Sequence, residues 1–132
     1  MASKALQAQM RTMRNAHAPH IDFGEFKGLI KTSPKVLPSD IDMIYERRSQ
    51  FLVCEWKRNG ESISTGQLIL LRNLAALPNF NVLIIHGNTD EETLVSEVEW
   101  IKQGELVHKG DSLDDLKRII IEWYEFADGG YA

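Results

Sequence analysis

The chain has 132 residues, of which 43% are hydrophobic and 26% charged, a composition typical of one folded domain rather than a disordered or fibrous chain. Its one cysteine, Cys54, excludes an internal disulfide and a cysteine-rich zinc site, so we expect a cytoplasmic protein. The net charge of −4 gives no overall attraction to nucleic acid, and no apolar run is typical of a signal peptide or a membrane span.

The charge is unevenly distributed along the chain. Residues 1–35 hold six Lys/Arg and two Asp/Glu, whereas residues 88–132 hold four Lys/Arg and twelve Asp/Glu. A polyanion would therefore contact the N-terminal third, with Arg14 as a candidate residue. Solvated helix faces explain the same charges equally well.

Two helices are expected in the N-terminal third. In the first, Ser3 is the cap, Pro19 ends the helix, and one side carries apolar residues and a histidine: Leu6, Met10, Met13 and His17. The second is short, starts after Asp22 and stops before Pro34, with an inward side formed by Phe23, Phe26 and Ile30.

The pattern changes to a period of two after Pro38, which predicts a strand over residues 40–45. A polar break at residues 46–49 separates it from a second extended segment at residues 51–57. The two strands should pair as a hairpin.

The C-terminal two thirds are predicted to alternate helices and strands. A strongly apolar helix from Ser64 to Pro78 should be largely buried, and residues 80–85 read as an interior strand covered on both faces. An outer hairpin follows over residues 95–101 and 105–108, and a last helix over residues 112–126 has an inner stripe of Leu113, Leu116, Ile120 and Trp123. This order predicts an α/β fold with a mixed sheet and helices packed over it.

Acidic and basic residues converge on the expected first hairpin. Strand alternation places Glu55 and Lys57 on one face, and pairing brings Asp40 and Asp42 close to them. Carboxylate oxygens suit a hard cation such as Mg²⁺, or Mn²⁺ in its place. With Lys57 positioning water or offsetting charge on a phosphate, this group is best suited to phosphodiester hydrolysis.

These residues resemble the motifs of the PD-(D/E)XK nuclease superfamily. Residues 38–42, Pro-Ser-Asp-Ile-Asp, look like its acidic first motif, Glu55-Trp56-Lys57 looks like its E-x-K motif, and twelve residues separate Asp42 from Glu55. The resemblance implies that the Asp and Glu bind a divalent metal while the Lys assists the nucleophile. Because two aspartates are present, both Asp40 and Asp42 are candidate ligands, and the spacing favours Asp42.

The resemblance also implies a fold and an assembly. The family core is restriction-endonuclease-like, with the order αβββαβ, and would occupy about residues 20–87 of a single domain over residues 1–132. Residues 88–132 would add the outer hairpin and the C-terminal helix. Small members of the superfamily include Holliday-junction resolvases and virus-type nuclease modules, many of them homodimers.

Two further residues match positions that complete the metal site in such members. Glu25 corresponds to a Glu on the first helix, and Gln67 to a Gln soon after E-x-K. Each also fits a helix cap, since Asp22-x-x-Glu25 and Ser64-x-x-Gln67 have capping-box spacing.

Other candidates surround the hairpin. Arg47, Arg48 and Arg58 are predicted to contact the phosphate backbone, although a solvated turn explains them equally well. His86, just after the interior strand, either faces the site or ends the strand. Cys54 and Trp56 should lie on the opposite face, in the core.

The sequence thus predicts a Mg²⁺-dependent endonuclease acting on DNA, including structured or branched DNA. One alternative is an idle nuclease-like fold that binds nucleic acid or protein. Another is an interaction protein without this fold, in which Asp42 and Glu55 would lie on opposite faces of the sheet.

Overall fold

The structure, a computed structural model, describes residues 21–129. The first predicted helix, between Ser3 and Pro19, lies outside the described residues, and so does Arg14. The chain divides into two compact units, residues 1–40 and residues 41–132, and each is considered by itself.

Unit 1 contains one short element, the 3₁₀ helix η1 (Gly24–Phe26), within its described part. The longer helix expected up to Pro34 is wrong, and Phe26 and Ile30 are each 47% exposed rather than inward. The reason lies at Gly28, whose φ of +76° is incompatible with a right-handed helix and whose N–H donates to the Pro34 carbonyl at 3.1 Å.

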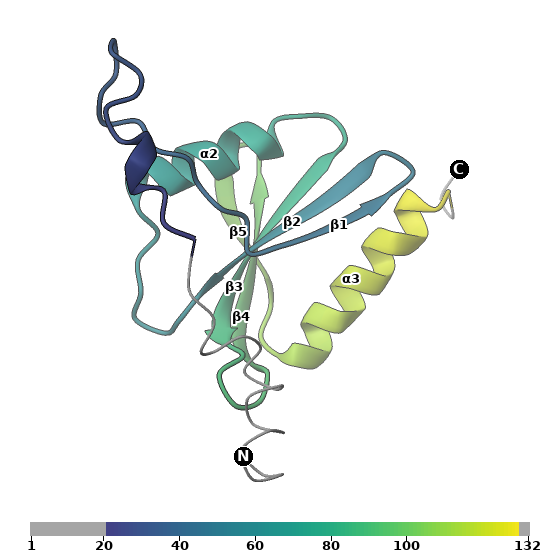
Figure 1. The fold of residues 1–132 in the computed structure, drawn as a ribbon. Coiled ribbons are helices and arrows are strands. Elements are labelled where there is room, and N and C mark those ends of the chain that lie inside the picture. The colour runs from purple at the N-terminus through teal and green to yellow at the C-terminus, as the bar shows by residue number, and fades with distance from the viewer. Residues whose placement is uncertain (1–20, 130–132) are drawn as a thin grey trace, which may run out of the picture. The chain divides into compact units, whose positions relative to one another are not determined.

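Unit 2 is built on a five-stranded mixed sheet in the order β1-β2-β3-β4-β5 (Figure 1). The strands are β1 (Met43–Arg47), β2 (Gln50–Lys57), β3 (Phe80–Asn88), β4 (Leu94–Lys102) and β5 (Glu105–Gly110). Strands β2 and β3 are parallel and are connected through helix α2 (Thr65–Ala75), while all other neighbours are antiparallel. Helix α3 (Leu113–Ala127) ends the unit. The predicted α/β class with a mixed sheet is confirmed, and two strands precede α2 in the described residues.

Both predicted hairpins are present, and each is closed by residues in left-handed backbone conformations. In the first, Arg47 pairs with Gln50 across Arg48 and Ser49, whose φ angles are 50° and 66°. In the second, Gln103 and Gly104 have φ angles of 52° and 79°. Positive φ at both central residues is typical of the tight turns that match the twist of antiparallel strands.

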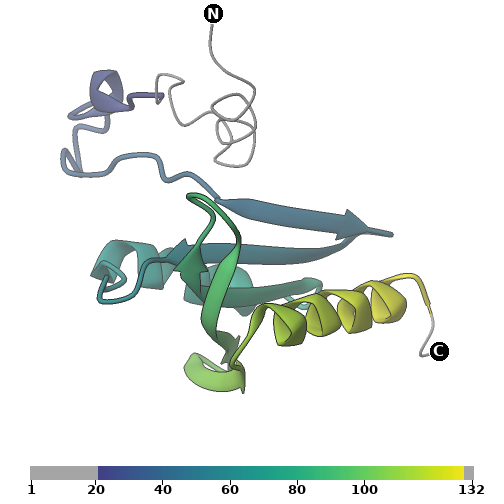
Figure 2. The same ribbon diagram turned by 90° about the horizontal axis from the view of Figure 1, so that it is seen from below.

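The sheet buries both of its faces, and alternate residues of β2 show how. Leu52 and Cys54 point to the side covered by α3, as predicted for Cys54, whereas Val53 points to the side covered by α2. Figure 1 shows the two helices on opposite sides of the fanned strands, and Figure 2 shows α3 running alongside the sheet. Trp56 also packs against the α3 side.

Helix α3 confirms its predicted extent. Ser112 caps it by accepting the N–H of Asp115 at 3.1 Å, and its inner side buries Leu116 and Trp123. Strand β3 is interior as predicted, because its residues from Val82 to Ile85 are at most 2% exposed.

Helix α2 differs from its prediction. The helix was expected to be largely buried, but Leu71 alone among its residues is buried, and Ile69 is 53% exposed. The reason is that α2 packs against one sheet face, which can cover only one side of the helix. No helix in residues 21–129 has the length and apolar character needed to cross a membrane.

Candidate active site

Glu55 is the one buried charged side chain in the described part of the chain, at 5% exposed. It lies on β2, on the face that α2 covers, two residues beyond the buried Val53. A carboxylate in such a position needs polar partners, because burying an unpartnered charge is costly. The side chains around Glu55 therefore decide what the site can do.

Asp42 is held directly beside Glu55. It comes just before β1, and continuing the register from the pair Met43–Cys54 places it opposite Glu55. Its Oδ2 accepts the backbone N–H of Trp56 at 2.9 Å, which anchors the carboxylate next to β2. The two carboxylates are thus neighbours across the hairpin, contrary to the arrangement expected of an unrelated interaction protein.

Two further side chains contact Glu55. Lys57 lies on the same face of β2, is 13% exposed in its side chain, and places Nζ 3.8 Å from Glu55 Oε1. Gln67, in the first turn of α2, donates from Nε2 to the same Glu55 oxygen at 2.5 Å. Asp42, Glu55, Lys57 and Gln67 therefore meet at one end of the sheet.

The helix-cap explanation for Gln67 is compatible with its contact to Glu55. The helix cap uses its backbone N–H, which donates to Ser64 Oγ at 3.2 Å, while its side chain is directed to Glu55. In a full capping box the glutamine side chain would instead return to the backbone of the cap residue. Gln67 thus serves both the helix and the site.

The surroundings of Glu55 raise its pKa to about 7. Burial is the largest cause, followed by the negative charge of Asp42, while Lys57 and Gln67 act in the opposite direction. Two neighbouring carboxylates that resist simultaneous ionisation would be stabilised by a cation between them. Two hard oxygen donors at the edge of a partly dry site fit Mg²⁺ or Mn²⁺.

Glu25 and Asp40 belong to unit 1 and are exposed there. Asp22 accepts the N–H of Gly24 at 2.8 Å, two residues on, so the capping box that offered another explanation for Glu25 does not form. The metal roles of both residues remain predictions.

Three of the arginines predicted to contact nucleic acid, Arg47, Arg48 and Arg58, lie in the described residues and are paired with acidic side chains. Arg47 and Arg48 donate from Nε to Asp128 Oδ1 at 2.7 and 3.1 Å, which joins the tip of the first hairpin to the C-terminal end of α3 (Figure 2). Arg58 is paired through both terminal nitrogens with Asp90. These pairs are exposed, so they can exchange with a phosphate.

A second polar group, of which the sequence indicated only His86, lies on the same sheet face. His86 Nε2 is 2.6 Å from Glu99 Oε1, and His108 Nδ1 is 2.9 Å from Glu97 Oε2. The available signal was the alternation Glu97-x-Glu99 on a strand that follows His86 after a short turn. The alternation alone does not show that the two glutamates lie beside His86, because that depends on the register between the two strands.

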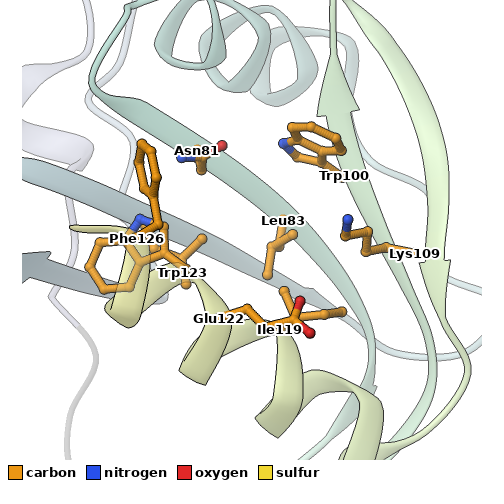
Figure 3. A pocket seen from close by; sticks show the side chains of 9 residues that line it. Asn81, Leu83, Trp100, Lys109, Ile119, Glu122, Trp123 and Phe126 are labelled. Atoms are coloured by element: carbon orange, nitrogen blue, oxygen red, sulfur yellow. The ribbon is translucent and has the colours of Figure 1, made fainter. Parts of the chain in front are cut away.

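The opposite face carries a pocket of about 290 Å³ (Figure 3). Its walls are mostly aromatic and aliphatic side chains from β2, β3, β4 and α3, together with the polar residues Asn81, Lys109 and Glu122. Lys109 Nζ lies 5.0 Å from the centre of the Trp100 ring. The pocket contains neither the carboxylates of the candidate site nor Lys57.

No protein-family model, curated protein or solved structure matches this chain.

Proposed function

We propose that this protein is a Mg²⁺-dependent endonuclease that hydrolyses phosphodiester bonds in DNA. The observation that supports this most is the meeting of Asp42, Glu55 and Lys57, with Gln67, on one sheet face. The resemblance to PD-(D/E)XK nucleases rests on the same residues. The β1–β2 hairpin, α2 and β3 would then represent part of a restriction-endonuclease-like core.

The carboxylates of Asp42 and Glu55 would hold the cation, which when bound polarises a phosphodiester and favours formation of hydroxide from water. Gln67 fixes the orientation of Glu55 through its short hydrogen bond, leaving the second oxygen of Glu55 for the cation. Asp42 is fixed in a similar way by the Trp56 N–H.

Lys57 is suited to the phosphate itself. Its ammonium group lies beside Glu55, and it would offset the charge that develops on the phosphate as water attacks phosphorus. The phosphorus–oxygen bond to the leaving nucleotide breaks in the same displacement, and that oxygen takes up a proton. The products are one phosphorylated end and one hydroxyl end.

The test compares cleavage by the full chain with cleavage by two site variants. With Mg²⁺ present, Glu55→Gln and Lys57→Ala should each lose about 10²- to 10³-fold in cleavage rate. Glu105→Ala and Lys117→Ala, at exposed positions on β5 and α3, are the matched controls and should cleave normally. EDTA should abolish cleavage. Normal cleavage by both site variants would overturn the proposal.

The substrate is best found with a panel of linear, nicked, single-stranded and four-way DNA, with RNA alongside. A metal site contacts the phosphate group, which all nucleic acids share. The choice of substrate must therefore come from contacts elsewhere on the protein. Sedimentation of the same sample tests the homodimer that the resemblance implies.

A second candidate is a nuclease-like fold that no longer cleaves and binds nucleic acid or protein instead. It is favoured by the pairing of Arg47, Arg48 and Arg58 with acidic residues of the described chain. Calorimetry with Mg²⁺ and Mn²⁺ separates the two, because an idle fold should take up no ion through Asp42 and Glu55.

A further inference from the structure

The polar group on β3 and β4 has the composition and spacing of a metal site. His86, Glu97 and Glu99 each offer one ligand atom, and these three atoms lie within 4.8 Å of one another. The side chains of His86 and Glu99 are 23% and 19% exposed, and that of Glu97 is more open at 41%. We propose that they bind a divalent transition-metal ion such as Zn²⁺, at a site separate from Asp42 and Glu55.

The strand register explains why the three side chains converge. His86 pairs with Glu97 across β3 and β4, while its Nε2 reaches diagonally to Glu99 Oε1 at 2.6 Å. Glu97 and Glu99 alternate along β4 and so share a face. The strand register therefore brings the three side chains to one place on the sheet.

The spacing also suits an inserted ion. Ligands bound at about 2.0–2.1 Å in a tetrahedral site are separated from one another by about 3.3 Å. The observed separations, from 2.6 Å between His86 and Glu99 to at most 4.8 Å within the group, lie on both sides of that value. Small side-chain adjustments would therefore suffice.

The donor set distinguishes this site from the first. An imidazole nitrogen among the ligands favours zinc and other first-row transition metals, whereas carboxylates alone favour magnesium. Three protein ligands would leave a position for water or for a ligand oxygen.

Neighbouring residues are placed to orient one of the ligands. His108 Nδ1 lies 2.9 Å from Glu97 Oε2, and its Nε2 lies 3.2 Å from Asp111 Oδ1. Partners of this kind fix a ligating side chain and typically raise metal affinity.

The strand backbone is irregular next to two of the proposed ligands. The β3–β4 register shifts between His86 and Gly87, and the β4–β5 register shifts between Val98 and Glu99. A side chain at Gly87 would collide with the Leu94 carbonyl, which explains the glycine there. Bulges commonly redirect side chains at functional sites, and here they flank two of the three ligands.

The position of this second site indicates what a bound ion would do on this face of the sheet. His86 pairs with Lys57 in the β2–β3 register, so the second site lies on the same face as Glu55. Without a cation, Glu97 and Glu99 would repel a polyanion approaching that face. A bound divalent ion would offset this charge.

The test measures Zn²⁺ binding to the untagged full chain by competition with a chromophoric chelator. One equivalent should bind, and His86→Ala and Glu99→Gln should each weaken it by more than about tenfold. Glu99→Gln retains a hydrogen-bonding group for His86, so it keeps the test valid if His86→Ala fails to fold.

Two controls separate this site from the proposed Mg²⁺ site and from the two histidines of the N-terminal segment, His17 and His20. Glu55→Gln should retain the Zn²⁺ equivalent, and so should the double variant His17→Ala/His20→Ala. The proposal is overturned if no equivalent binds, if it persists in both Glu99→Gln and His86→Ala, or if either control loses it. Because no cleavage is measured, failure here is distinct from failure of the nuclease proposal.

Discussion

The two faces of the sheet in unit 2 are covered by helices of different extent, and their chemistry differs accordingly. Helix α3 has 15 residues and buries four of them against the sheet, including Leu116 and Trp123. Helix α2 has 11 residues and buries only Leu71. The face under α3 is apolar, whereas the face under α2 changes from apolar to polar beyond Val53 and Ile84.

This difference indicates how a reactive group can be placed in a small fold. Glu55 lies where α2 begins, close enough to the apolar core to be dry but beside polar partners. A fully covered face would exclude the phosphate, and an open one would leave the carboxylates in bulk water. The partly covered face is therefore suited to the proposed phosphodiester chemistry, and the other face to stability.

The largest expected loss of stability comes from a substitution on the sheet face that α3 covers. Leu52→Ala, on the same strand as Glu55 but pointing to the other face, should lower the free energy of unfolding by about 2–5 kcal/mol. Urea titration measures it. The same loss with and without Mg²⁺ is expected, because the side chain points away from the proposed metal ligands. A loss no larger than that caused by Ser64→Ala, which removes a helix cap, would contradict this ranking.

The next effect is a pH dependence that originates from Glu55. Its folded-state pKa of about 7 lies above its ordinary value of 4.5, so the folded state favours the protonated form. Its contribution to stability is complete below pH 4.5 and is lost as the pH rises through 7. In metal-free protein this loss should reach at most about 3 kcal/mol.

Glu55→Gln is the variant that tests this pH dependence, because it keeps the shape and removes the charge. Its urea midpoint should fall less than that of the unmodified chain between pH 5 and pH 8. Added Mg²⁺ should restore stability at pH 8 to the unmodified chain only. Equal pH profiles for the two proteins would show that Glu55 is not the group responsible.

A smaller effect separates the two roles of Gln67 and its neighbour. Ser64→Ala removes the cap of α2 and should cost about 1 kcal/mol while leaving the Gln67–Glu55 hydrogen bond and metal binding in place. Gln67→Ala retains the serine cap but removes the contact with Glu55, so it should weaken Mg²⁺ binding. Calorimetry and urea titration of both variants measure the two properties. Equal effects of the two changes on Mg²⁺ affinity would contradict separate roles.

The smallest effect on stability is expected at the junction of the first hairpin and α3. Asp128→Asn removes the partner of Arg47 and Arg48, and because the groups are exposed the urea midpoint should hardly change. If the protein binds DNA there, the released arginines should steepen the dependence of log affinity on log salt by about one for each new phosphate contact. An unchanged slope would show that these arginines do not contact DNA.

The wrong predictions have a common physical cause. The helix expected after Asp22 was inferred from apolar spacing, but Gly28 adopts a left-handed conformation that ends any helix. The burial of α2 was inferred from apolar residues around most of its circumference, yet a helix on one sheet face buries only one side. In both cases the pattern reported which residues are apolar, and not what surrounds them.

Local periodicity by itself determined most elements of unit 2. Alternation over residues 40–57 identified the first hairpin and placed Glu55 and Lys57 on one face, and apolar runs identified β3 and α3. These features depend on near neighbours in the chain, so the sequence carries them directly.

Only the tertiary structure decided how distant residues meet. It placed Asp42 opposite Glu55, directed the Gln67 side chain to Glu55 rather than to its own helix cap, and brought His86 to Glu99. It also paired the hairpin arginines with Asp128, 80 or more residues away. Such contacts depend on strand register and helix packing, which are set by the whole core and not by any local pattern.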